Sequence, residues 1–206
     1  MIKTIRESAL AGLLISLAAA VYLRCGNEIV GAVLFSVGLI AVLLMKAYLF
    51  TGKIGYAKDL RGFCDCAIIF AVNAIVAVLF GWMFSLASGS GISAIQSRLD
   101  KPMWRIFVDS AGCGALIYIA CEGWAATKNP LIPACCVMAF IVAGFEHCVA
   151  DAFYLGASGL SWRGAGFVIM VAIGNSIGSL TVRWLQIGIE AIVPDGMPSD
   201  IIRRGE

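Results

Sequence analysis

Six apolar runs follow one another along this chain, and they constrain its fold more than any other feature. Each run is bounded by charged residues or by glycine and proline, and the six occupy residues 8–23, 30–50, 64–86, 106–125, 131–155 and 165–184. About twenty helical residues cross the hydrocarbon core of a bilayer, which is roughly 30 Å thick. We therefore predict an all-α integral membrane protein in which six transmembrane helices form a single domain over residues 1–206.

Composition agrees with this prediction and excludes other classes of protein. Hydrophobic residues make up 61% of the chain and charged residues 14%, whereas about a quarter of a typical soluble domain is charged. Fifteen basic and thirteen acidic residues leave a net charge of +2. Because such a chain has no polybasic face, we expect no binding to nucleic acid.

The cysteines and the single histidine argue against a metal centre. Most of the eight cysteines lie within apolar runs, where a thiol acts as a small buried hydrophobe. Cys64 and Cys66 have the wrong spacing for structural zinc and lack a second pair of ligands. We expect no metal, no cofactor and reduced cysteines.

Basic residues predict the orientation of the chain in its membrane. Six spans put both termini on one side of the membrane. Eight basic residues fall on that side, namely Lys3, Arg6, Lys53, Lys58, Arg61, Lys128, Arg203 and Arg204. Five fall on the opposite side, namely Arg24, Arg98, Lys101, Arg105 and Arg163. The positive-inside rule then makes both termini cytoplasmic in a multi-pass inner-membrane protein. Lys3 and Arg6 before the first run are also typical of a signal peptide, but an internal repeat favours a retained span.

The repeat becomes visible when the chain is shifted by 102 residues. Span one then falls on span four, so that Ser8, Ala9, Gly12 and Leu14 match Ser110, Ala111, Gly114 and Leu116. Asn73 and Trp82 likewise match Asn175 and Trp184. Two three-helix repeats, about 1–90 and 100–193, are therefore expected in opposite orientations, as in many transport proteins, followed by a short cytoplasmic tail at 194–206.

Polar side chains interrupt the second and fifth runs. Lys46 and Thr51 lie in the second run, and Glu146, His147 and Asp151 lie in the fifth. Such groups are costly in hydrocarbon and mark functional sites by default. Unwound backbone at that depth is tolerated where it lines a polar cavity, and paired breaks point to a binding site. We predict that the second and fifth helices are broken.

Each of these residues also has a plain structural interpretation. Asn73 and Asn175 either support the two breaks or simply bond neighbouring helices. The Thr51 hydroxyl could bond to its own helix, and His147 could be a satisfied core histidine.

The roles of Glu146 and Lys46 are likewise open. Glu146 either anchors the fifth-span break by accepting backbone N–H groups, which we favour, or pairs with Lys46 or another cation. Lys46 either faces the pore or extends to water at the membrane edge.

Four sequence blocks together resemble the formate/nitrite transporter family: 35–39 (FSVGL), 49–52 (LFTG), 144–147 (GFEH) and 173–178 (IGNSIG). The resemblance covers nearly the whole chain in order. It implies an aquaporin-like fold assembled as a homopentamer in membrane lipid. Each protomer would carry its own pore for small monovalent anions of weak acids, such as formate, nitrite or hydrosulfide.

The resemblance also implies residue roles. Thr51 and His147 would form the central polar pair, with Asn175 in support and Lys101 near the outer vestibule. The constrictions would be lined by Leu39, Leu49 and Phe50 on the cytoplasmic side and by Phe35 and Phe140 on the outer side. This chain departs from the family pattern at Lys46 and Tyr48, where a small residue and an acid are usual, and at Asp151, where an amide is expected.

The preferred hypothesis is a channel or transporter for formate, with transient protonation of the anion at the Thr/His pair. Hydrosulfide or nitrite is the alternative substrate. An intramembrane enzyme that uses His147 and Glu146 as an acid/base pair is disfavoured because the chain offers no nucleophile or metal set. A water pore is disfavoured because paired Asn-Pro-Ala motifs are absent from the sequence.

Overall fold

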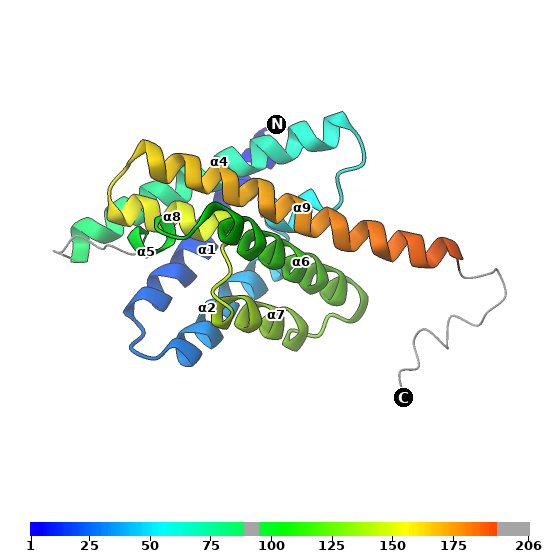
Figure 1. The fold of residues 1–206 in the computed structure, drawn as a ribbon, viewed down its shortest axis with the longest axis horizontal. Helices are drawn as coiled ribbons and strands as arrows, with labels where there is room; N and C mark the ends of the chain where they lie inside the picture. Colours follow the sequence, from blue (N-terminus) through cyan, green and yellow to red (C-terminus); the bar gives the residue numbers. More distant parts are fainter. Residues whose placement is uncertain (89–94, 193–206) are drawn as a thin grey trace.

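The computed structural model describes residues 1–88 and 95–192, and within these ranges all regular structure is helical (Figure 1). The helices are α1 Ile2–Arg24, α2 Glu28–Leu44, α3 Phe50–Ile54, α4 Leu60–Ser88, α5 Gln96–Leu99, α6 Met103–Thr127, α7 Leu131–Val142, α8 Cys148–Ser158 and α9 Trp162–Ile192. The six predicted runs correspond to α1, α2 with α3, α4, α6, α7 with α8, and α9. The chain thus has the predicted all-α architecture.

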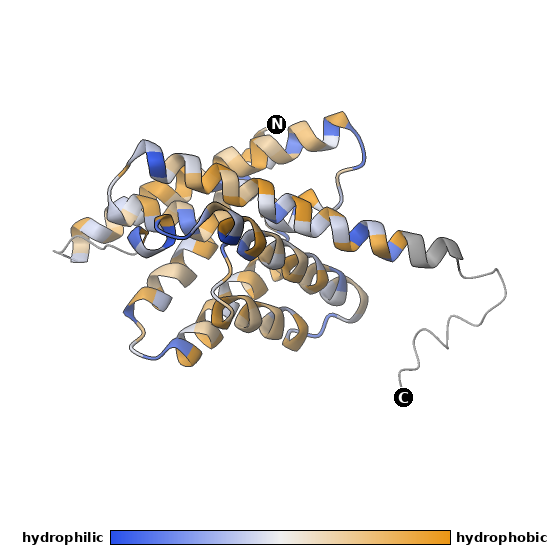
Figure 2. Ribbon diagram, in the orientation of Figure 1, coloured by the Kyte–Doolittle hydropathy of each residue, from blue (hydrophilic) through white to orange (hydrophobic). Residues whose placement is uncertain are grey.

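Four of the described helices are long and apolar enough to cross a membrane. They are α1, α4, α6 and residues Trp162–Ile187 of α9, while α2 and α7 are shorter apolar helices. Figure 2 shows hydrophobic residues along all the long helices and hydrophilic residues mainly at the connections. Large apolar side chains such as Ile75, Leu79 and Trp82 on α4 are more than half exposed. A surface of this kind suits lipid, so the chain is a multi-pass membrane protein.

The second and fifth runs are each interrupted by an extended segment. α2 ends at Leu44 and α3 begins at Phe50, whereas α7 ends at Val142 and α8 begins at Cys148. Lys46, Glu146 and His147 lie within the interruptions, whereas Thr51 and Asp151 lie in the first turns of α3 and α8. That these pieces complete six spans in two inverted repeats remains a prediction.

Small residues allow the helices to pack closely around the interruptions. α6 packs on α9 and α4 packs on α8. A Cβ atom added at Gly114 of α6 would lie 2.0 Å from the Asn175 carbonyl oxygen, and one at Gly178 of α9 would lie 1.9 Å from the Ala111 carbonyl oxygen. Neither position can hold a larger residue, since backbone lies against backbone as is common between membrane helices.

One boundary differs from the expectation. The sixth apolar run was expected to end at residue 184, but α9 continues without a break from Trp162 to Ile192. Residues 183–187 contain no proline or glycine before Gly188, so nothing in the local sequence ends the helix there. The predicted cytoplasmic tail at 194–206 lies outside the described residues.

Candidate functional site

Asn73 on α4 holds the first interruption together. Its Oδ1 accepts a hydrogen bond from the Phe50 N–H at 2.9 Å, and its Nδ2 donates to the carbonyl oxygens of Ser8 at 2.6 Å and Tyr48 at 3.0 Å. The side chain is fully buried. The first backbone N–H groups of a helix have no partner within it, so Asn73 satisfies the start of α3 and joins it to α1.

Asn175 on α9 makes the same set of bonds at the second interruption. Its Oδ1 accepts from the Cys148 N–H at 3.0 Å, and its Nδ2 donates to the carbonyl oxygens of Ser110 at 2.8 Å and Glu146 at 2.9 Å. This side chain is also fully buried. Both asparagines therefore bond to backbone N–H and carbonyl groups that the interruptions leave without a helical partner. They do more than join two neighbouring helices.

The two interruptions also share a backbone conformation. Lys46 has φ 54° and Gly144 has φ 70°, and each is the second residue after the last residue of its helix. Glycine adopts this left-handed conformation freely, whereas a residue with a Cβ pays about 1–2 kcal/mol. Lys46 is therefore strained where its counterpart is not.

Thr51 and His147 meet between the two interruptions. Thr51 Oγ1 lies 3.0 Å from His147 Nε2, and both side chains are buried. His147 Nδ1 also accepts a hydrogen bond from the Ala150 N–H at 3.3 Å, which caps α8. A neutral imidazole that accepts at Nδ1 carries its hydrogen on Nε2. Nε2 therefore donates to Thr51 Oγ1, and the threonine hydroxyl hydrogen is left free to donate to a third group.

Apolar side chains enclose this polar pair. The rings of Phe35 and Phe140 lie 6.0 Å apart at 88°, and Phe140 stacks on the His147 ring at 6.0 Å. Leu39 and Leu49 are at most 2% exposed. Phe35 and Phe140 line one cavity, whereas Leu39 and Leu49 line another. Phe50 is also buried and packs on Phe70. His147 lines the first cavity, and Leu49, two residues before Thr51, lines the second, so the Thr51–His147 pair lies between two cavities that apolar and charged side chains line together.

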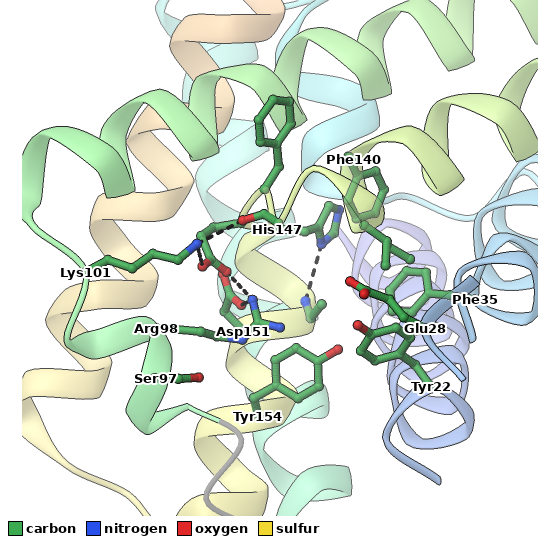
Figure 3. Close-up of a pocket in the computed structure, with 15 residues that line it drawn as sticks. Tyr22, Glu28, Phe35, Ser97, Arg98, Lys101, Phe140, His147, Asp151 and Tyr154 are labelled. Atoms are coloured by element: carbon green, nitrogen blue, oxygen red, sulfur yellow. Dashed lines mark hydrogen bonds and ion pairs between the residues drawn. The ribbon is translucent and has the colours of Figure 1, made fainter. Parts of the chain in front are cut away.

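The first cavity, which we call the arginine vestibule, has a volume of about 240 Å³ (Figure 3). Arg98 and Lys101 lie on one side of it, and Tyr22 and Glu28 lie across from them. Arg98 pairs with the buried Glu146 carboxylate. Its guanidinium also lies 3.6 Å from Asp151 and stacks over the Tyr154 ring at 4.6 Å.

These contacts correct the preferred role for Glu146. The carboxylate pairs with Arg98 and with Lys101 Nζ at 2.6 Å, so it does not anchor the interruption through backbone N–H groups. Asn175 accepts the Cys148 N–H instead, and because an amide can also donate, it bonds to the carbonyl oxygens of Ser110 and Glu146, which a carboxylate could not do.

Lys101 is engaged on several sides. Besides Glu146, its ammonium group donates to Asp109 at 2.7 Å and to the Gly144 carbonyl oxygen at 2.9 Å. Burial alone would lower the pKa of Lys101, but its hydrogen bonds to Asp109 and Glu146 raise that pKa above the ordinary value. Lys101 is thus a charged, positioned residue in the vestibule wall rather than a free cation.

Sequence reasoning missed Arg98 as a site residue. The available signal was a second cation three residues before Lys101. The short helix α5 brings Arg98 over the fifth-span interruption. Asp151, noted as a departure from the family pattern, makes no hydrogen bond from either carboxylate oxygen among the described residues.

The second cavity, which we call the lysine vestibule, has a volume of about 640 Å³. Its lining includes Lys3, Glu7, Leu39, Lys46, Tyr48, Leu49, Lys53, Tyr56, Trp124 and Lys128. Lys46 therefore lies at a cavity wall with an exposed side chain. The Tyr56 hydroxyl donates a hydrogen bond to Glu122 at 2.5 Å. The pKa of Tyr56 is raised, mainly because the phenol is partly buried and secondly because of this hydrogen bond.

Comparison with curated proteins finds transporters. The chain is 29% identical over 184 residues to the uncharacterized transporter YrhG of Bacillus subtilis (strain 168), covering 74% of this chain and 67% of that protein. It is 24% identical over 187 residues to the formate channel FocA of Escherichia coli (strain K12), covering 75% of this chain and 65% of the relative. The chain thus spans about two thirds of the length of these relatives.

Two solved structures share the fold. One is an FNT family ion channel with a TM-score of 0.74 and 21% identity, covering 94% of this chain and 89% of that one. The other is a pentameric formate channel with formate bound, with a TM-score of 0.71 and 16% identity, covering 92% and 95%. The family model for formate/nitrite transporters matches residues 1–187. The chain therefore belongs to the formate/nitrite transporter family, whose members are channels and transporters rather than enzymes.

Proposed function

We propose that this protein is a membrane channel for small monovalent anions of weak acids, with formate as the favoured substrate. The observation that carries the proposal is the buried Thr51–His147 contact, which lies between two separate cavities and next to the apolar side chains of Phe140 and Leu49. The relative named as a formate channel supports the choice of anion. Nitrite and hydrosulfide are also small monovalent anions of weak acids, so they are the alternatives to test.

We also propose that the channel consists of six helices in two inverted repeats. The support is the matched set of three hydrogen bonds at Asn73 and Asn175. The left-handed residues Lys46 and Gly144 occupy matching places in the two interruptions. Assembly as a homopentamer, with both termini facing the cytoplasm of an inner membrane, is part of the same proposal.

The proposed mechanism follows from the cost of desolvation. A bare anion is strongly opposed by the side chains of Phe35, Phe140, Leu39 and Leu49, whereas its neutral conjugate acid crosses at lower cost. The free hydroxyl hydrogen of Thr51 donates to the anion between these walls. His147 fixes that hydroxyl through Nε2 and stays neutral, since its Nδ1 lone pair is used by the Ala150 N–H. The transient proton therefore comes from hydronium in the aqueous solution of a vestibule, which leaves a neutral water molecule, rather than from an imidazolium.

Anion uptake into proteoliposomes tests this function. We expect formate to pass and chloride to be excluded, with nitrite and hydrosulfide compared in the same vesicles. Thr51→Val keeps the size of the side chain but removes its hydroxyl, and should lower formate flux at least tenfold. Ser176→Ala is a matched control, because among the described residues the Ser176 hydroxyl bonds within its own helix, to the Ala172 carbonyl oxygen. Folded protein that passes none of the weak-acid anions would overturn the proposal.

A further inference from the structure

The two vestibules differ sharply in charge. In the arginine vestibule both cations contact carboxylates, and the lining holds two cations and three acids, namely Arg98 and Lys101 with Glu28, Glu146 and Asp151. The lysine vestibule is lined by four lysines and one acid, namely Lys3, Lys46, Lys53 and Lys128 with Glu7. Positive potential is therefore concentrated at one mouth only.

The four lysines lack acidic partners. Among the described residues, no carboxylate lies within 4.0 Å of their ammonium groups, and Glu7 pairs with Arg6 at 3.1 Å. Lys53 instead lies over the Tyr48 ring at 4.6 Å, and Lys128 lies over the Trp124 ring at 5.8 Å.

Tyr48 explains part of this charge excess. It occupies the place in the first interruption that Glu146 occupies in the second, since the backbone carbonyl of each accepts from the supporting asparagine. Glu146 neutralises two cations in its vestibule, whereas the phenol of Tyr48 neutralises none.

Backbone strain singles out two of the same lysines. Lys46 with φ 54° and Lys128 with φ 57° are the non-glycine residues of the described chain with positive φ. Both follow the end of a helix, where glycine is the usual residue, and both line the lysine vestibule. A strained residue at a cavity indicates a function for its side chain.

We propose that the lysine vestibule is a binding site for a phosphate-bearing anion, and that the bound anion blocks the pore. Ammonium groups bind phosphate as point charges, and attraction to four of them grows with the charge of the ligand. A volume of about 640 Å³ is typical of small-molecule pockets. Tyr48 and Trp124 supply aromatic surface for a nucleotide base.

The position of the site explains the block. Leu39 and Leu49 line the same cavity and are almost completely buried. A polyphosphate held by the lysines would lie over these two leucines, which the proposed mechanism places in the path of the anion. The binding half of this proposal is independent of the channel function, whereas the blocking half rests on it.

Calorimetry on the detergent-solubilised full chain tests binding, with tripolyphosphate and ATP as ligands at low salt. The test variant is the double substitution Lys46→Gly and Lys128→Gly, which removes two charges and relieves both strained positions, so that it folds. We expect binding to weaken about tenfold or more, given the loss of two ammonium contacts with a multivalent anion. Lys58→Gln is the matched control, because this exposed lysine lies outside the vestibule lining, and it should bind as the parent does.

The comparison of ligands and lipids identifies the source of the phosphate. Tighter binding of ATP than of tripolyphosphate would show that the aromatic surface binds a nucleotide base. Loss of tripolyphosphate binding in nanodiscs of anionic lipid would show that lipid headgroups occupy the site. Absence of binding by both ligands, or equal binding by parent and double variant, would overturn the proposed site.

Formate flux in proteoliposomes tests the block. Tripolyphosphate added on the lysine side should reduce flux through the parent, and the double variant should need about ten times more of it. Binding without any effect on flux would overturn the block. Absence of formate flux in every sample would instead refute the channel function, while the binding result would stand.

Discussion

Asn175→Ala tests how the fifth-span interruption is held in place. The substitution deletes three buried hydrogen bonds, one from the Cys148 N–H and two to the carbonyl oxygens of Ser110 and Glu146. A buried hydrogen bond contributes about 0.5–1.5 kcal/mol, and an orphaned backbone group costs about 1–3 kcal/mol. Hydrogen bonds between membrane helices average about 0.6 kcal/mol, so we expect a loss of about 2–4 kcal/mol in total.

The assay is thermal unfolding of the detergent-solubilised protein, followed by tryptophan fluorescence, with formate flux measured in parallel. Ser176→Ala is the control in the adjacent position. We expect Asn175→Ala to unfold several degrees below this control and to lose flux, because Cys148 begins the helix that His147 caps. Asn73→Ala should behave alike, since it removes the matching bonds at the first interruption. An unfolding temperature equal to that of the control would refute the reasoning.

Three further outcomes are expected. Lys46→Gly should raise the free energy of unfolding by about 0.5–1 kcal/mol, because relief of the left-handed strain exceeds the added freedom of the unfolded chain; an unchanged or lower unfolding temperature would contradict this. Glu146→Gln should destabilise the protein by about 2–4 kcal/mol in the same assay, since Arg98 and Lys101 lose a shared buried counter-charge, and a neutral effect would show that solvent compensates. Asp151→Asn should cost less stability than Glu146→Gln in thermal unfolding, because Asp151 accepts no hydrogen bond among the described residues and its one ion pair, 3.6 Å from Arg98, leaves the pair of Arg98 with Glu146 in place; a loss as large as that of Glu146→Gln would contradict this.

The family and the candidate pore residues were within reach of the sequence, and the reason is that their signals are local. LFTG and GFEH each lie within four consecutive residues, so the sequence alone supports the hypothesis that Thr51 pairs with His147. The pairing stays a hypothesis for function, although the two side chains lie 3.0 Å apart.

For the residues that support the pore, the sequence predicted the positions but not all of the contacts. The sequence favoured the correct residues at Asn73 and Asn175 but left their role open. The role of each asparagine depends on hydrogen-bond partners up to 65 residues away in the sequence. For Glu146 the preferred anchoring role was wrong and the alternative, a pair with a cation, is what the structure shows. Arg98, 48 residues earlier, lies beyond any local pattern.

The sequence is therefore sufficient to show which segments lie in lipid, through the apolar runs, their lengths and the polar residues that interrupt them. These are properties of consecutive residues, and the bilayer selects on them directly. The tertiary structure decided which charges meet. Coulomb interactions fall with distance in space rather than along the chain. Only packing could show that one vestibule neutralises its cations while the other leaves four lysines without an acidic partner among the described residues.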